Sequence, residues 1–109
     1  IIASTGSRLD EEGYEYYARL LSSRDHVEGT LQMMARWSTD ALYDDLPEIR
    51  ARCLVIAGMQ DTAVPPRVSA MAATRLPQAE LRKMDGLGHL AHEEAPGAVI
   101  RLIEEWCDT

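Results

Sequence analysis

The stretch Cys53-Leu-Val-Ile-Ala-Gly-Met-Gln-Asp61 places five apolar residues in a row before a glycine and, three residues later, an acidic side chain. A run that is apolar at every position is typical of a strand covered on both faces in a parallel sheet. The segment Ala79-Glu-Leu-Arg-Lys-Met84 alternates and predicts a second strand. Between them, Pro65-Pro66 opens a helical stretch that Pro77 ends. This order of elements indicates a right-handed parallel crossover, and so an α/β fold.

The segments outside this unit are predicted to be helical. Residues Pro96 to Cys107 are expected to form the last helix. Upstream, Ser7-Arg-Leu-Asp10 has the form of a capping box and predicts a first helix over 9–22. Asp25 is expected to cap a second helix, and a short third turn is expected over 39–43. The chain is therefore predicted to be all-helical in its first part and α/β in its second.

The amino-acid composition excludes several classes of protein. The 109 residues, 46% hydrophobic and 27% charged, suit one globular domain. A net charge of −7 without a segregated basic face disfavours nucleic acid as a partner. No apolar run is long enough to span a membrane. Cys53 and Cys107 show neither metal-ligand nor redox spacing, so a reducing, cytoplasmic location is expected.

One polar residue follows each predicted strand. Asp61 lies three residues after Gly58, and His89 lies five residues after Met84. Loops at the carboxyl ends of neighbouring parallel strands share one edge of the sheet, where ligands gather. A carboxylate that orients an imidazole, whose other nitrogen acts as a base, makes up two thirds of a catalytic triad. We predict such a pair here; the alternative is that Asp61 is a turn residue and His89 a capping or surface group.

The residues after His89 raise the question of a metal site. His92, Glu93 and Glu94 follow it closely and have side chains that bind metals. The zinc-protease helix motif, however, needs histidines four residues apart with glutamate directly after the first. We therefore expect no metal and no other cofactor. The two glutamates are expected to begin the last helix, whose dipole favours acidic groups there, with His92 facing solvent or supporting His89.

Several stretches of the second part together carry a family pattern. They are Leu46-Pro-Glu-Ile-Arg-Ala-Arg-Cys-Leu-Val-Ile-Ala-Gly-Met-Gln-Asp61, Val64-Pro-Pro66, Leu76-Pro-Gln-Ala-Glu-Leu81 and Gly88-His-Leu-Ala-His-Glu-Glu-Ala-Pro96. Over residues 46–107 the chain resembles the C-terminal part of an α/β-hydrolase. The resemblance implies a core segment over 46–109, with two parallel strands and flanking helices. It also implies that Asp61 is the triad acid and His89 the triad base, with a serine N-terminal to both.

The first part carries a narrower resemblance. Its motifs are Thr5-Gly-Ser-Arg-Leu9, His26-Val-Glu-Gly29 and Met33-Met-Ala-Arg-Trp37. They are similar to the helical region of the magnesium-chelatase accessory proteins of bacteriochlorophyll synthesis, a subgroup of that family. This resemblance implies that residues 1–45 form a lid. The sequence departs from the pattern at Ser38, where an acidic residue is expected, and at Cys53, where proline is common.

The methionines and the tryptophan of the first part are candidate binding residues. Met33, Met34 and Trp37 form a soft apolar surface that is suited to lining a substrate pocket beneath a lid, because thioethers adapt to large flat ligands. Equally, these side chains are suited to packing one helix against another. The sequence leaves both interpretations open.

The nucleophile is missing from this chain. A G-x-S-x-G elbow needs two glycines four residues apart, and none of the seven glycines here has that spacing. We therefore expect the chain to be the C-terminal portion of a longer protein, with the serine in the N-terminal half. The resemblances imply two alternative functions for the complete protein: hydrolysis of an ester, amide or related bond in a small-molecule substrate, or a non-hydrolytic accessory role that binds a tetrapyrrole or magnesium chelatase.

Overall fold

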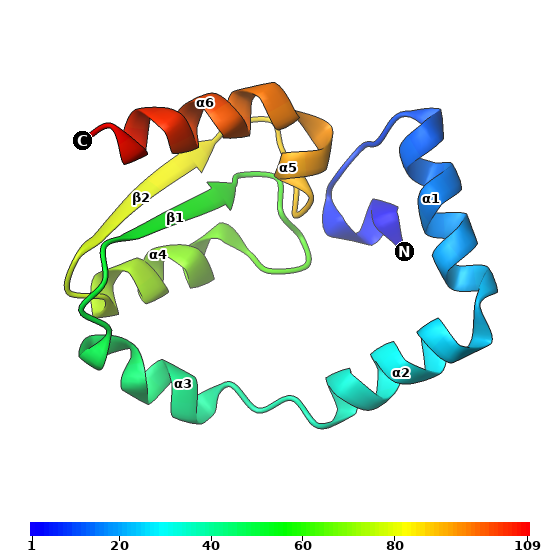
Figure 1. The fold of residues 1–109 in the computed structure, drawn as a ribbon, viewed down its shortest axis with the longest axis horizontal. Coiled ribbons are helices and arrows are strands. Elements are labelled where there is room, and N and C mark those ends of the chain that lie inside the picture. Colours follow the sequence, from blue (N-terminus) through cyan, green and yellow to red (C-terminus); the bar gives the residue numbers. More distant parts are fainter.

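The computed structural model describes residues 1–109 and contains two parallel strands, β1 (Cys53–Gly58) and β2 (Ala79–Met84). The register pairs Cys53 with Ala79 and Gly58 with Met84. The helix α4 (Pro66–Arg75) connects the strands, so the strand–helix–strand unit predicted from the sequence is confirmed (Figure 1). Because the strands run in the same direction, the loops that follow Gly58 and Met84 lie at the same edge of the sheet.

Two helices cover the strand pair from opposite sides (Figure 1). One is α4, and the other is α6 (Pro96–Cys107), which begins at the predicted residue. The expectation that Glu93 and Glu94 begin this last helix is wrong. They belong to a separate short helix, α5 (Ala91–Glu94), because the residue before a proline is disfavoured in helical geometry: Ala95 has φ −139° and ψ 63°, and Pro96 restarts the chain in a new direction.

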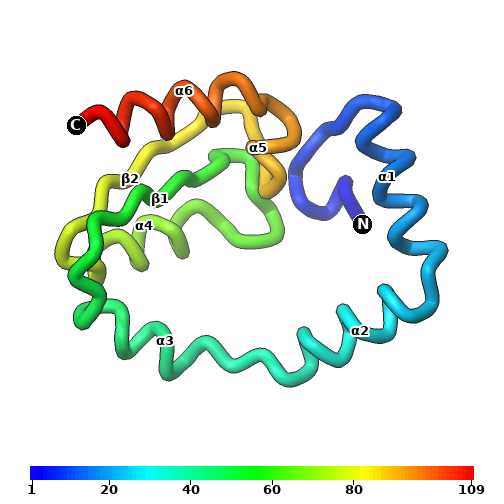
Figure 2. Tube along the Cα trace, in the orientation of Figure 1, coloured from blue at the N-terminus to red at the C-terminus, as the bar shows by residue number.

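The first 45 residues form helices that stand away from the strands. Figures 1 and 2 show them as a curve that leaves the carboxyl-end loops of the strands and returns near the amino end of β1. We call residues 11–45 the helical arch. A 3-10 turn, η1 (Ile2–Thr5), precedes it and another, η2 (Leu46–Glu48), follows it. The arch consists of α1 (Glu11–Ser22), α2 (Arg24–Ala35) and α3 (Asp40–Asp45).

The predicted helices are present, but two caps differ from the prediction. Asp10 is itself the cap of α1, because its backbone is extended and its carboxylate accepts the amide of Gly13 at 2.8 Å. Ser7 takes no part in that cap. Ser23, not Asp25, caps α2 by accepting the amide of His26 at 3.4 Å. In each case two neighbouring residues have capping side chains, and the one with extended backbone geometry becomes the cap.

The packed core is small and lies at the carboxyl end of the sheet. Only seven of the 109 residues are buried: Ile2, Ser7, Ala57, Gly58, Gly88, Ala91 and Val99. The radius of gyration is 15.7 Å, whereas a compact domain of this length has about 13 Å. The arch accounts for the difference, since none of its helices contains a buried residue. None of the helices combines the length and the apolar character that crossing a bilayer needs.

Candidate active site

The loop after β1 fixes the carboxylate of Asp61 in one orientation. The Asp61 amide donates to the carbonyl oxygen of Gly58 at 3.1 Å. One carboxylate oxygen, Oδ1, accepts the backbone amides of Ala63 at 2.9 Å and Val64 at 2.8 Å. This is the turn geometry that aspartate favours, and it occupies only one of the two oxygens. The second oxygen, Oδ2, is left to interact with a side chain.

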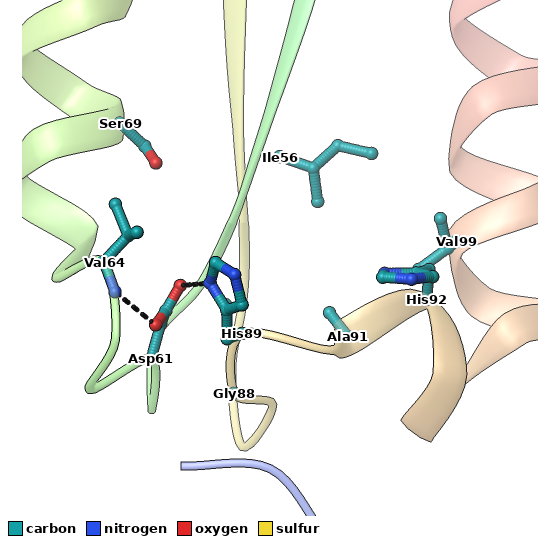
Figure 3. Close-up of a pocket in the computed structure, with 10 residues that line it drawn as sticks. Ile56, Asp61, Val64, Ser69, Gly88, His89, Ala91, His92 and Val99 are labelled. Carbon is teal, nitrogen blue, oxygen red and sulfur yellow. Dashed lines mark hydrogen bonds and ion pairs between the residues drawn. The ribbon is translucent and has the colours of Figure 1, made fainter. Parts of the chain in front are cut away.

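The loop after β2 brings His89 to that oxygen. Gly86, at φ +73°, supplies the left-handed residue that the tight turn needs. The Nδ1 atom of His89 lies 2.9 Å from Oδ2 of Asp61 (Figure 3). The Asp61 side chain is 11% exposed and the His89 side chain 41% exposed. The structure therefore places together the two residues that the sequence singled out, 28 positions apart.

Hydrogen bonding decides which imidazole nitrogen is free. An ionised carboxylate only accepts, so the proton of a neutral His89 belongs on Nδ1, where it donates to Asp61. The Nε2 atom then carries a lone pair, and it makes no hydrogen bond within the chain. An imidazole held in this tautomer by a carboxylate is the arrangement that general-base catalysis uses.

The pKa of Asp61 reflects two opposing influences. Burial alone would raise it, because desolvation disfavours the ionised carboxylate. The hydrogen bonds from the Val64 amide, from His89 and from the Ala63 amide outweigh burial and lower the pKa of Asp61 below its ordinary value of 3.8. Asp61 is therefore ionised at neutral pH, as an acceptor for the imidazole must be.

A cavity of about 240 Å³ adjoins the pair. Figure 3 shows Asp61 and His89 beyond the ends of the two strands, with α4 on one side and α6 on the other. Ser69 is the one serine among the lining residues, but it makes no hydrogen bond to His89. The lining residues are Ile56, Gly58, Asp61, Val64, Ser69, Gly88, His89, Ala91, His92 and Val99.

The other polar residues near His89 have separate partners. His92 lies 3.5 Å from Glu93 through its Nε2 atom and its side chain is largely exposed. The Oε1 atom of Glu93 accepts the hydroxyl of Tyr17 at 2.7 Å. No three His, Cys, Asp or Glu side chains of residues 1–109 gather closely enough to hold a metal ion.

Two residues with roles near His89 are missed by sequence reasoning. Glu94 accepts two backbone amides, and Ser7 accepts the amide of Leu90, as described below. Both residues belong to patterns that indicate local helix capping, Ser7 at the start of the capping-box motif and Glu94 before Pro96. Their actual partners lie up to 86 positions away in the sequence, so no local pattern reveals them.

The candidate binding residues of the arch lie in different surroundings. Trp37, which is 66% exposed, lines an apolar pocket of about 470 Å³ with side chains of α3 and α4. Val64 lines both this pocket and the cavity beside His89. Met33 and Met34 are exposed on α2 and are not among the residues that line the pocket at Trp37.

The fold and the aspartate–histidine pair at the carboxyl ends of parallel strands define the α/β-hydrolase class. The sequence profile of the alpha/beta hydrolase fold matches residues 10–96. A crystal structure of an alpha/beta hydrolase enzyme, from the metagenome of sediments from the lagoon of Mar Chica in Morocco, superposes with a TM-score of 0.71. It is 29% identical in sequence, and the match covers 93% of this chain and 46% of that one. The chain belongs to the alpha/beta hydrolase fold family.

The chain is also similar in sequence to the magnesium-chelatase 30 kDa subunit of Rhodobacter capsulatus. It is 44% identical over 108 residues. The aligned region covers 99% of this chain and 38% of the relative. The chain thus spans less than half the length of these two proteins, and the similarity to the magnesium-chelatase subunit includes the arch as well as the strands.

Proposed function

We propose that this chain supplies the acid and the base of a serine hydrolase. The observation that carries the proposal is the hydrogen bond between Asp61 and the Nδ1 atom of His89, which leaves Nε2 free at the edge of a cavity. In this proposal the nucleophilic serine comes from a part of the protein outside this chain. The free thiols of Cys53 and Cys107 support a reducing compartment, and we place the protein in the cytoplasm.

The chemistry assigns each residue one task. The Nε2 atom of His89 takes the proton of the serine hydroxyl as its oxygen attacks the carbonyl carbon of an ester or amide. Asp61 holds the imidazole in the required tautomer and stabilises the imidazolium that forms. His89 then gives its proton to the leaving alcohol or amine, and water, activated by the same nitrogen, releases the acyl group from the serine.

The apolar pocket at Trp37 supports a substrate with an apolar part. Because Val64 lines both this pocket and the cavity at His89, a ligand that fills the pocket reaches toward the proposed reacting atoms. In this proposal the arch acts as the lid, with Trp37 in contact with the substrate. Met33 and Met34 would then contribute from the adjoining exposed face of α2 when the substrate is large.

A serine-directed phosphonate probe tests the hydrolase proposal. The protein produced from the complete reading frame should be labelled covalently at one serine, and His89→Ala should abolish the labelling, because the serine loses its base. His26→Ala is the matched control, since His26 is an exposed histidine of α2 and should leave labelling unchanged. Absence of a G-x-S-x-G elbow in the complete reading frame, or undiminished labelling of His89→Ala, would contradict the proposal.

A second candidate function is a non-hydrolytic accessory role in tetrapyrrole metabolism. The similarity to the magnesium-chelatase 30 kDa subunit of Rhodobacter capsulatus, 44% identical over 108 residues that include the arch, favours it. The exposed apolar side chains Met33, Met34 and Trp37 offer a surface for a flat macrocycle or for a chelatase subunit. Under this proposal the aspartate–histidine pair is not used for catalysis.

Tryptophan fluorescence separates this candidate from the first. Titration with protoporphyrin IX should quench Trp37 in a Trp106→Phe variant, which leaves Trp37 as the one tryptophan of this chain. The reciprocal variant, Trp37→Phe, is the control and should show much weaker quenching, because Trp106 lies on α6, away from the arch. Equal quenching in both variants would argue against a tetrapyrrole site at Trp37.

A further inference from the structure

A short segment before the arch touches both loops of the candidate active site. We call residues 4–8 the brace. The carbonyl oxygen of Thr5 accepts the backbone amides of Thr62 at 3.3 Å and of His89 at 3.0 Å. The hydroxyl of Thr62 also donates to the carbonyl oxygen of Ser4 at 2.7 Å. Thr62 directly follows Asp61 in the chain. The carbonyl oxygen of Thr5 therefore holds the backbone next to Asp61 and the backbone of His89 at the same time.

The backbone on each side of His89 is held in the same way. The amide of Gly88 donates to Oε2 of Glu94 at 2.7 Å, and the amide of Leu90 donates to the hydroxyl of Ser7 at 2.8 Å. Ser7 is 3% exposed, the least exposed polar side chain of the chain. The three consecutive amides at 88, 89 and 90 therefore all donate to the brace or to Glu94.

Glu94 connects the brace to the loop that follows β2 and carries His89, which we call the histidine loop. Its Oε1 atom accepts the amide of Arg8 at 2.6 Å, while Oε2 accepts the amide of Gly88. Hydrogen bonds to an ionised acceptor are stronger than neutral ones. A single half-buried carboxylate thus joins two backbone segments that no strand or helix connects.

Close backbone contacts leave this arrangement little freedom. A Cβ atom at Gly88 would overlap the backbone of Gly6 and Ser7, and one at Gly58 would overlap the carbonyl of Gly88. Gly6, at φ +74°, approaches the carbonyl of Gln60 equally closely. The end of β1, the histidine loop and the brace are consequently stacked with backbone against backbone, which only glycine permits.

We propose that Glu94 and Ser7 are positioning residues, which hold His89 in register with Asp61 through the brace. The expected effect on catalysis rests on the proposed function. The expected effect on the hydrogen bond between His89 and Asp61 does not. Only Leu9 and Asp10 separate the brace from α1, which begins at Glu11. A displacement of the helical arch therefore shifts the acceptors of the amides of His89 and Leu90, so the position of the arch and the geometry of the aspartate–histidine pair are linked.

Glu94→Gln tests the proposal in the protein produced from the complete reading frame. Glutamine keeps one acceptor oxygen but turns an NH₂ group toward the other amide, so one of the two bonds is lost. Because misplacing a catalytic group by about 1 Å costs up to about 100-fold, we expect kcat for an ester substrate to fall about 10- to 100-fold with KM nearly unchanged. Glu105→Gln, at an exposed position of α6 without a side-chain partner, is the matched control.

A spectroscopic readout separates positioning from general stability. The low-field proton resonance of His89 Nδ1–H, assigned by its loss in His89→Ala, reports the hydrogen bond to Asp61. We expect Glu94→Gln to shift it and Glu105→Gln to leave it in place. A folded Glu94→Gln variant with kcat and resonance equal to those of the control would overturn the proposal, even if its thermal midpoint were lower.

Two further outcomes are decided by the same measurements. If Glu94→Gln fails to fold, Ser7→Ala replaces it: a fall in kcat with a shifted resonance supports the proposal, and unchanged values overturn it. If the parent protein hydrolyses no ester and binds no phosphonate, the proposed function fails. The resonance alone then decides the inference, with a shift in Glu94→Gln supporting it and no shift overturning it.

Discussion

Asp61 divides its two carboxylate oxygens between backbone and side chain. Because Oδ1 organises the turn through Ala63 and Val64, Oδ2 meets His89 without freedom to rotate away. Asp61→Asn should keep the turn, since the amide oxygen can still accept both backbone amides. Its NH₂ group would then face Nδ1 and favour the opposite imidazole tautomer, with the proton on Nε2. Under the proposed hydrolase function, we expect kcat of the complete protein to fall by about 10⁴-fold, the usual cost of this change in a serine triad.

Steady-state kinetics with a chromogenic ester measures this loss. Asp25→Asn makes the same substitution on the exposed surface of α2 and is the control. An Asp61→Asn variant that retained the activity of the control would show that the carboxylate does not orient the base. Circular dichroism should confirm that the two variants are equally folded, so that the comparison concerns the tautomer alone.

The lowered pKa of Asp61 also makes stability depend on pH. In the unfolded chain the carboxyl has its ordinary pKa, whereas in the folded chain the pKa is lower, so the folded state binds the proton less readily. The stabilisation is therefore complete above the ordinary value of 3.8 and is lost as the pH falls through the lowered folded value. Urea unfolding of wild type and Asp61→Asn should give a stability difference that is constant near neutrality and shrinks in acid. A difference that grew as the pH fell would contradict the sign of this shift.

At the scale of elements, the arch is tied to the α/β unit at both ends. At one end the hydroxyl of Tyr17 in α1 donates to Glu93 in α5 at 2.7 Å. At the other end, the Nε atom of Arg75 in α4 donates to the backbone carbonyl of Tyr43 at 3.0 Å. The guanidinium of Arg75 also lies 4.3 Å from the centre of the Tyr43 ring. Between these ties α2 packs against α1 but exposes its apolar side chains.

The Tyr17 tie can be followed by titration. Burial, together with the hydrogen bond to Glu93 and the charge of Glu93, raises the pKa of Tyr17 to about 12. Near-ultraviolet absorbance should therefore show one tyrosine ionising at about pH 12 that is absent in Tyr17→Phe. The lost hydrogen bond should cost about 1 kcal/mol of stability at neutral pH. Since the folded pKa is raised, this difference should persist up to pH 10.0 and decline as the pH rises through about 12.

Tyr14→Phe is the control for this titration, because Tyr14 lies on the same helix and makes no side-chain hydrogen bond. The variant should retain the step at high pH. If Tyr14→Phe removed the high-pH step and Tyr17→Phe did not, the tie between α1 and α5 would be assigned to the wrong residue.

The sequence predicts the elements well where the signal is local. The apolar run at Cys53 and the alternating run at Ala79 give both strands with their observed starts, and parallel pairing then brings Asp61 to His89. The caps are less predictable, because Ser and Asp neighbours offer equivalent side chains and the backbone chooses between them. The partners of Glu94 are beyond prediction, since a carboxylate that accepts amides 6 and 86 positions away follows no local periodicity.

At the scale of the whole molecule, many large apolar side chains are exposed and few are buried. Side chains such as Leu31, Leu42 and Ile100 are each more than half exposed. β1 pairs only with β2, so the other edge of β1 has no strand beside it. A two-stranded sheet is marginal without further strands or helices against it, and an unpaired edge invites association. These features suit a chain that packs against additional parts of a larger fold.

Calorimetry of the isolated chain tests whether it folds cooperatively without further parts of the protein. If the 109 residues folded cooperatively throughout, unfolding would absorb about 75 kcal/mol, at about 0.7 kcal/mol per residue. With seven residues buried, we expect the isolated chain to unfold over a broad range with a much smaller enthalpy and to associate as its concentration rises. The protein from the complete reading frame should instead show a sharp transition. A sharp transition of the isolated, monomeric chain near the full enthalpy would show that the braced carboxyl end of the sheet, with its tied arch, is sufficient for cooperative folding.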